Sequence, residues 1–278
     1  MMELSLPEKN ISGVSLCLCR DDVVISAKNG NKVTLLKSRD LENWERSVFE
    51  RGYKDRTTPV VSHLSDSLSV FMSRNYQPYL RSLETDELVS LKTPYLKKGV
   101  VSGHPVAFEN LYLVPGYGIP YGCKLVSPVL FEYEEGQWFL RSFISISEDF
   151  GAELRHTVLA LKGGVLYAFI GSSFPFYHIF MAKSYDGGKT WTKPRMTGIS
   201  GMYPVAEVWG NTLVLACYNR DMSRIELFAE SVDGKWRKVK THRVEDRVLS
   251  LDGVVFKGSL ILTAALSSGE AVVVSLNL

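Results

Sequence analysis

Residues 184–191 read Ser-Tyr-Asp-Gly-Gly-Lys-Thr-Trp, and this octapeptide carries the strongest structural signal in the chain. Its serine and aspartate side chains can hydrogen-bond to backbone N–H groups of a tight turn. Gly188 can supply a positive φ, and the indole of Trp191 can cover apolar surface between neighbouring sheets. The stretch follows an apolar run at residues 178–183, so we expect a hairpin turn at the end of a β-strand.

A shorter form of the same pattern returns along the chain. A serine or glutamate, any residue, and then a carboxylate or amide follow strand-like runs at Ser38/Asp40, Ser82/Glu84, Glu132/Glu134, Ser184/Asp186, Ser231/Asp233 and Ser275/Asn277. Successive copies lie roughly 44 to 52 residues apart, a period typical of propeller blades and other repeat units. Tryptophan follows four of these pairs, at Trp44, Trp138, Trp191 and Trp236. The spacing therefore predicts six similar units.

Each unit is expected to contain four short strands separated by turn residues. The expected blades cover residues 11–50, 57–93, 103–144, 155–197, 202–242 and 248–278. The last blade has only three strands in sequence order, which would leave an unpaired edge, and the run at residues 2–6 can supply the fourth. We therefore predict one all-β domain over residues 1–278, a six-bladed β-propeller of four-stranded antiparallel blades closed by the N-terminal strand. An open two-domain β structure is the alternative.

Composition sets the class of protein. The chain has 278 residues, 45% of them hydrophobic, and a formal net charge of +2, which is too small to imply nucleic acid as a partner. No apolar stretch is long enough to span a membrane, and residues 1–10 do not read as a signal peptide. The four cysteines form no disulfide pattern, so we expect a reduced, cytoplasmic protein. The two glutamines hint at a thermophilic source.

The pattern formed by Ser184, Asp186, Gly188, Thr190 and Trp191 resembles the Asp-box, or BNR repeat, of the sialidase superfamily. In that superfamily the box is structural and lies on the face opposite the ligand site. The resemblance implies an Arg-Ile-Pro signature, three arginines for a substrate carboxylate, an acid/base aspartate and a Tyr/Glu nucleophile pair. This chain lacks Arg-Ile-Pro, and Tyr203 stands at a strand start as the nucleophile does, but in the fifth unit.

Candidate ligand residues come from the starts of the innermost strands, which converge on the axis of a propeller. One residue per blade is expected there: Ser12, Thr58, His104, His156, Tyr203 and Asp252. Arginines and loop aromatics extend this set, because guanidinium groups suit anions and aromatic rings suit sugar faces. The expected ligand-binding residues are Arg56, His104, Arg155, His156, Tyr76, Tyr117, Tyr177 and Arg220.

Two functions fit this set. One is a binding propeller, with little or no catalysis, that recognises a protein partner or a polar, partly anionic, glycan-type ligand at its upper face. The alternative is a glycoside hydrolase of the sialidase-like type, with Asp252 as acid/base and Tyr203 as the other catalytic residue. We expect no cofactor and no metal, because the histidines lack the short spacing of zinc ligands.

Overall fold

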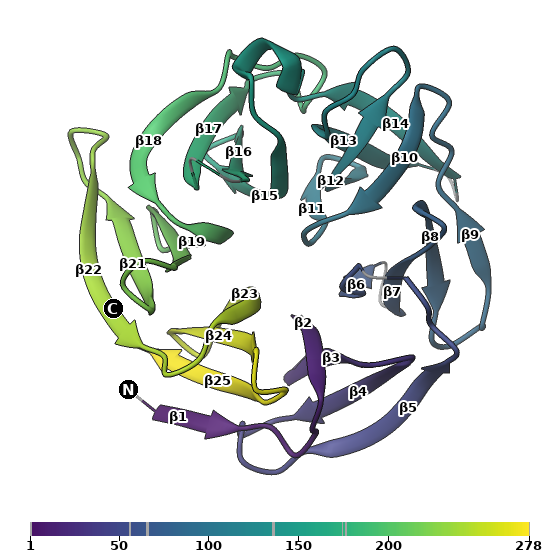
Figure 1. Cartoon of the computed structure of the whole chain (residues 1–278), viewed down its shortest axis with the longest axis vertical. Helices are drawn as coiled ribbons and strands as arrows, with labels where there is room; N and C mark the ends of the chain where they lie inside the picture. Colours follow the sequence, from purple (N-terminus) through teal and green to yellow (C-terminus); the bar gives the residue numbers. More distant parts are fainter. Residues whose placement is uncertain are drawn as a thin grey trace.

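The computed structural model describes residues 2–55, 57–64, 67–134, 137–173, 175 and 177–277. Within these residues, six antiparallel sheets surround a central axis, each as one blade (Figure 1). The short 3₁₀ helix η1 (Ser147–Phe150) lies between the third and fourth blades, and none of the helical structure in these ranges is long and apolar enough to cross a membrane. The prediction of an all-β, six-bladed propeller is confirmed.

The blades follow one another along the chain. The first consists of β2 (Ile11–Cys19), β3 (Asp22–Asn29), β4 (Lys32–Ser38) and β5 (Glu45–Arg51). The second consists of β6 (Val60–Leu64), β7 (Ser67–Arg74), β8 (Gln77–Ser82) and β9 (Leu88–Ser90). The third consists of β10 (Leu96–Val101), β11 (Val106–Phe108), β12 (Leu111–Pro120), β13 (Ser127–Glu134) and β14 (Gln137–Phe143).

The remaining blades repeat the order. The fourth consists of β15 (Leu154–Lys162), β16 (Val165–Ser172), β17 (His178–Ser184) and β18 (Arg195–Ser200). The fifth consists of β19 (Met202–Trp209), β20 (Thr212–Asn219), β21 (Arg224–Glu230) and β22 (Trp236–Arg243). The sixth consists of β23 (Val248–Phe256), β24 (Ser259–Leu266), β25 (Ala271–Leu276) and β1 (Met2–Ser5).

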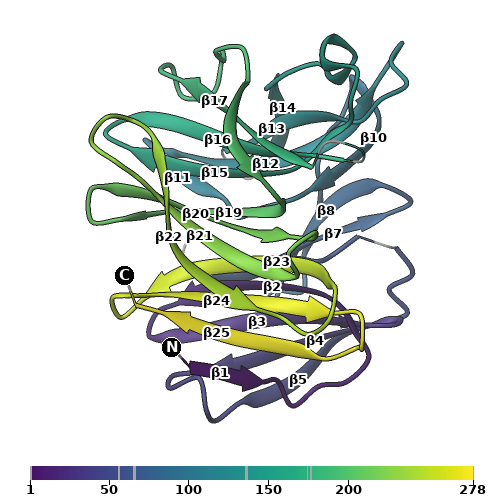
Figure 2. The ribbon, with the colours of Figure 1, turned by 60° about the vertical axis from the view of Figure 1, so that its left-hand side comes forward.

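The N-terminal strand closes the ring, as predicted. β1 pairs antiparallel with β25, with Leu4 opposite Val273 and Ser5 opposite Val272 (Figures 1 and 2). The backbone groups of β25 are thereby paired on both sides, and the open edge that the last blade would otherwise present is covered.

The third blade begins earlier than the expected range 103–144. Its inner strand is split into β10 and β11, which both pair with the long strand β12. The break between them contains Gly103 and Pro105, and proline cannot donate a backbone hydrogen bond to a ladder. His104 therefore lies in the break, part-way down the inner wall, and does not begin a strand.

The strand after the octapeptide also differs from expectation, because it forms at β18 and residues 191–194 remain outside the sheet. Pro194 immediately precedes β18, and its missing N–H explains why the strand starts after it. The fourth blade consequently extends to Ser200, beyond the expected end at residue 197.

The hydrophobic core lies between blades. Six clusters of buried side chains occur in the described part of the chain, and each joins two neighbouring blades. Tryptophans fill several of these layers: Trp138 is fully buried between blades two and three, while Trp191 and Trp236 pack against the next two clusters. The inner strands are correspondingly apolar, whereas the outer strand β22 is charged and exposed, which protects its edge from pairing with other chains.

Similar hydrogen bonds form in turns between third and fourth strands. The Ser184 hydroxyl donates to Asp186 (2.8 Å) and accepts the Gly188 N–H (2.7 Å), while Asp186 accepts the Thr190 N–H (2.9 Å). In the first blade the Ser38 hydroxyl donates to Asp40 (3.0 Å), and in the fifth the same bond joins Ser231 to Asp233. The repeated Ser/Asp pairs are therefore turn-forming groups.

The carboxylates of these turns are expected to make the unfolding free energy of the protein sensitive to acid. Hydrogen bonds lower the pKa of each: from the Asn43 N–H to Asp40, from the Thr190 hydroxyl to Asp186, and from the Ser231 hydroxyl to Asp233. A lowered folded-state pKa contributes stability that is present above the unfolded pKa and is lost as pH falls through the folded value. Below about pH 4, we expect the unfolding free energy of the wild type to fall more steeply than that of the triple variant Asp40→Asn/Asp186→Asn/Asp233→Asn. Urea unfolding between pH 2.5 and 7 measures this, and parallel pH profiles would contradict it.

Candidate functional site

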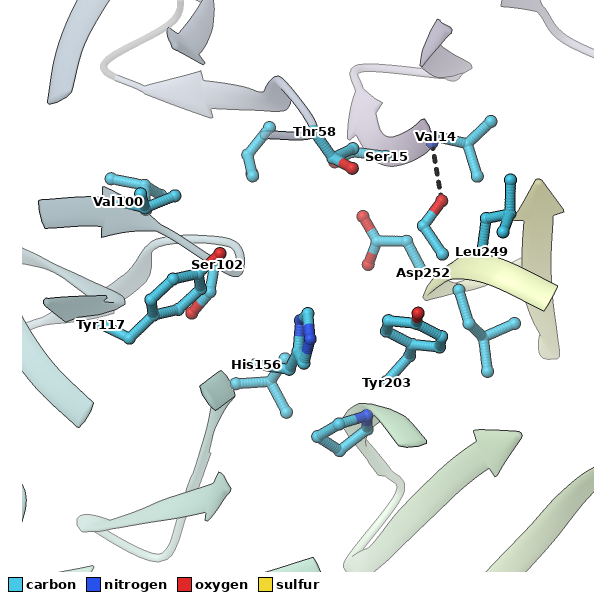
Figure 3. A pocket seen from close by; sticks show the side chains of 16 residues that line it. Val14, Ser15, Thr58, Val100, Ser102, Tyr117, His156, Tyr203, Leu249 and Asp252 are labelled. Atoms are coloured by element: carbon cyan, nitrogen blue, oxygen red, sulfur yellow. Dashed lines mark hydrogen bonds between the residues drawn. The ribbon is translucent and has the colours of Figure 1, made fainter. Parts of the chain in front are cut away.

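The inner strands enclose an axial channel with two cavities. We call the face where the inner strands begin the upper face; the loops between second and third strands lie on the same side. The upper cavity, about 90 Å³, is lined by Tyr117, His156, Tyr203 and Asp252, among others (Figure 3). The lower cavity, about 290 Å³, is lined by residues further along the inner strands, including His104 and Glu207. Asp252 borders both cavities.

Two bulges place rings in the upper cavity. The register of β15 shifts between Arg155 and Thr157, and that of β19 shifts between Met202 and Val205. His156 (φ 49°) and Tyr203 (φ 55°) lie in these bulges with left-handed backbone conformations. Bulges near functional sites commonly redirect a side chain, and here both rings face the axis (Figure 3).

The rings contact one another edge to face. The centroids of His156 and Tyr203 are 4.9 Å apart at 73°, and those of Tyr117 and His156 are 6.0 Å apart at 64°. Burial, together with the nearby positive charge of Arg155, lowers the pKa of His156 to about 4. Burial also raises the pKa of Tyr117 and of Tyr203. At neutral pH the cavity therefore presents a neutral imidazole and two phenols, which both donate and accept hydrogen bonds.

Asp252, in the middle of β23, connects three blades. Its Oδ2 accepts hydrogen bonds from His104 Nε2 (2.7 Å) and from the Leu16 N–H (3.0 Å), and its Oδ1 accepts from the Gly253 N–H (2.9 Å). Burial disfavours protonation of His104, but the charge and hydrogen bond of Asp252 outweigh it and raise the pKa of His104. The pair is thus a charge-assisted link across the channel.

Glu207 lies in the lower cavity. Its neighbours on β19 are apolar, and within the described residues it forms neither a hydrogen bond nor an ion pair. Burial raises its pKa to about 7, with His104 opposing the shift and Asp252 adding to it.

The expected site residues occupy three levels. His156, Tyr203 and Tyr117 line the upper cavity, with Asp252 below them, whereas His104 lies lower still. Tyr76, Tyr177 and Arg220 lie in upper-face loops or at their ends; the Tyr177 hydroxyl accepts from Arg220 (3.0 Å), and Lys98 lies over the Tyr76 ring at 4.6 Å. Arg155 pairs with Glu153 at the start of β15. Arg56 lies outside the described residues.

Glu207 lies four residues after Tyr203 in sequence and is not among the site residues expected from the sequence. The structure separates them, because Tyr203 faces the upper cavity and Glu207 the lower one. The sequence does contain an indication that Glu207 is unusual. Its carboxylate interrupts the apolar run Val205–Val208 of an inner strand, where both faces of the sheet are covered by neighbouring blades. Ser102 and Thr58 also line the upper cavity.

Comparison with known proteins rests on structure. No family model matches the sequence, and no curated protein matches it. A Dyadobacter fermentans protein of unknown function superposes with a TM-score of 0.78 at 13% identity, covering 99% of this chain and 98% of the other. The intramolecular trans-sialidase of Ruminococcus gnavus, in complex with oseltamivir carboxylate, gives 0.66 at 11% identity, covering 96% and 94%. Trypanosoma rangeli sialidase in complex with sialic acid gives 0.67 at 12% identity, covering 98% of this chain but only 56% of the sialidase.

The chain has a sialidase-like propeller fold. Identities of 11–14% over nearly the whole chain show this fold alone. They carry no residue of the trypanosomal or bacterial enzymes over to this protein, since one fold hosts many functions.

Proposed function

We propose that this protein is a binding propeller that takes a small, polar, partly anionic ligand of glycan type at its upper face. The observation that supports this most directly is the pair of left-handed aromatic residues, His156 and Tyr203, whose rings line the upper cavity. A left-handed backbone costs a residue with a Cβ roughly 1–2 kcal/mol. Such strain persists only where the surroundings enforce it, and it clusters at functional sites.

The cavity suits one polar substituent of a larger ligand. At roughly 15 Å³ per enclosed water, its volume of about 90 Å³ holds several waters or one carboxyl, hydroxymethyl or acetamido group. The Tyr117 and Tyr203 rings offer apolar faces beside hydroxyl groups, a combination that suits the alternating faces of a sugar. The rest of such a ligand would lie on the upper-face loops.

Cations near the upper cavity would hold the anionic group. Arg155 adjoins His156, and the charges of Arg247 and Arg220 act on Tyr203. Because His156 is neutral at pH 7, these arginines and not the imidazole would supply the positive charge. Guanidinium groups bind carboxylates in a bidentate geometry, so a carboxylate is the anion we propose.

Binding is better supported than sialidase-type catalysis. A tyrosine nucleophile needs an adjacent base, but the pKa of Tyr203 is raised by burial and Glu207 faces the other cavity. Asp252 already accepts three hydrogen bonds, so it is held as a structural acceptor. The Ser184–Trp191 turn fits an Asp-box of the sialidase superfamily in this proposal, and it lies on the face opposite the ligand.

The test is a titration with charged and neutral sugars. We expect N-acetylneuraminic acid or glucuronic acid to raise Tm, and methyl glucoside at equal concentration to raise it much less. Arg155→Ala should weaken acid binding by about tenfold or more, corresponding to one lost charge-assisted contact. Arg237→Ala, on the exposed strand β22, is the matched control and should bind as the wild type does.

Three results would overturn this proposal. Equal affinity of wild type and Arg155→Ala for every acid sugar would show that these sugars do not bind at the proposed site on the upper face. Release of 4-methylumbelliferone from its sialoside or glucoside, abolished by Asp252→Asn, would favour the glycoside hydrolase instead. Absence of any shift with the panel would favour a protein partner.

A further inference from the structure

The lower cavity is larger than the upper one and differs in chemistry. Its volume is about 290 Å³, and its walls come from β11, β15, β19 and β23. Most of the lining is aliphatic, including Val106, Leu161 and Val208. The ionisable side chains in it are His104, Glu207 and Asp252. It lies toward the far ends of the inner strands, on the side of the Ser/Asp turns and away from the proposed sugar site.

The three ionisable groups are unequal in their hydrogen bonding. Asp252 Oδ2 is hydrogen-bonded to His104 Nε2, and Asp252 also accepts two backbone N–H groups. Glu207 forms no hydrogen bond or ion pair within the described residues, although it borders the same cavity. A carboxyl group in an apolar wall without a partner costs free energy, and proteins retain few such groups without a role.

We propose that the lower cavity binds a small organic ammonium ion, with the charged nitrogen at Glu207 and a short alkyl body against the aliphatic wall. The free acceptor is a carboxylate, which selects a cation or a strong hydrogen-bond donor. The His104–Asp252 pair is internally neutral when His104 is protonated, so it leaves the charge of Glu207 uncompensated. The aliphatic lining then favours an ammonium that carries hydrocarbon over a hydrated inorganic ion.

The arrangement argues against a metal ion as the occupant. Across the described ranges, no three His, Cys, Asp or Glu side chains gather closely enough to ligate a metal. His104 Nε2 is directed at Asp252, so it is not available to coordinate in the cavity. A single free carboxylate binds an alkylammonium adequately but is a poor site for a transition metal, which needs several ligands.

The direct test uses n-butylammonium chloride as the probe, with n-butanol and ammonium chloride as matched controls. Saturation-transfer NMR and calorimetric titration at pH 8.5 should show binding of n-butylammonium, and at least tenfold weaker binding of both controls. Equal binding of n-butanol would show that the cavity is merely apolar and would overturn the proposal. Absence of n-butylammonium binding at 50 mM, about fiftyfold above a millimolar Kd, would overturn it as well.

Variants separate this site from the upper one. Glu207→Gln keeps the shape of the side chain and should lower n-butylammonium affinity at least tenfold, while Glu245→Gln, an exposed carboxylate elsewhere, should leave it unchanged. Glu207→Gln should also raise Tm by a few degrees at pH 8.5, because it removes a carboxylate that is costly to ionise there. Arg155→Ala should not alter butylammonium binding, so failure of the sugar proposal and failure of this one are distinguishable.

The pH dependence of the wild type gives a second measurement that requires no variant. The ionisable groups facing the cavity are Glu207, His104 and Asp252. Burial raises the pKa of Glu207 to about 7, so acidification to pH 5.5 protonates it, and it also favours the charged form of His104. Both changes disfavour a cation. Affinity for n-butylammonium, which stays charged throughout, should fall by a factor on the order of ten between pH 8.5 and 5.5. Affinity that is independent of pH would contradict the assignment to Glu207.

Discussion

Replacing Asp252 with alanine is expected to lower the free energy of unfolding by about 3 kcal/mol. The carboxylate is hydrogen-bonded to His104 of the third blade, to the Leu16 N–H of the first, and to the N–H of Gly253 on its own strand. Its side chain is 16% exposed and that of His104 is 24% exposed, so water replaces the lost bonds poorly. For a domain of this size, the change corresponds to a fall in Tm of about 5 °C.

Asp252→Asn is the matched control for this prediction. With its amide oxygen in the place of Oδ2, asparagine can still accept from the Leu16 N–H and from His104 Nε2–H, and it loses only the hydrogen bond from the Gly253 N–H. The loss should therefore be about 1 kcal/mol at pH 9. Asp252 raises the pKa of His104, and stability from a raised histidine pKa is fully present below the unfolded value and is lost as pH rises through the folded value. The deficit of Asp252→Asn should therefore be larger at pH 6 than at pH 9. A loss under 1 kcal/mol for Asp252→Ala would mean that the blades do not depend on this link.

The blade repeat was readable from sequence because its signals are local and recur. A strand–turn pattern with Ser/Asp pairs needs only neighbouring residues to form, and six copies reinforce one another. The missing fourth strand of the last blade could be inferred for a similar reason, since an unpaired edge must be covered and one apolar run preceded the first blade. These inferences required no knowledge of how far any side chain lies along the axis.

The depth of each side chain in the channel was not readable from sequence. The sequence predicts His104 at the start of an innermost strand, but β10 precedes it, and the break at Gly103 and Pro105 places it below the upper cavity. Bulges in β15 and β19 redirect His156 and Tyr203, and a bulge is a property of strand pairing that no single strand reveals. The six inner-strand positions, which the sequence predicts at one level, therefore lie at different levels of the channel. Glu207 was overlooked as a site residue for the same reason.

Gly188→Ala is expected to destabilise the protein by about 3 kcal/mol, the second large effect. Gly188 has φ +83°, a conformation that alanine adopts only with strain. A Cβ there would lie 2.2 Å from Leu130 Cδ2, and Leu130 is fully buried between the third and fourth blades, so it has little room to move. The same turn holds the Gly188 N–H on the Ser184 hydroxyl, which prevents the backbone from relaxing outward without breaking that bond.

Gly234→Ala separates the two causes of this loss, which are the strain of the left-handed backbone and the contact with Leu130. Gly234 lies in the related turn of the fifth blade with φ +76°, but nothing stands within 4 Å of its added Cβ. That variant pays only for the left-handed backbone, about 1 kcal/mol, so the difference of about 2 kcal/mol between the variants measures the contact with Leu130. Gly188→Ala/Leu130→Ala should then cost less than the sum of its two single changes, because the smaller residue makes space for the new methyl group. Urea unfolding of the four variants measures all of these quantities. Equal losses for Gly188→Ala and Gly234→Ala would show that strain in the turn, and not packing between blades, is what requires glycine there.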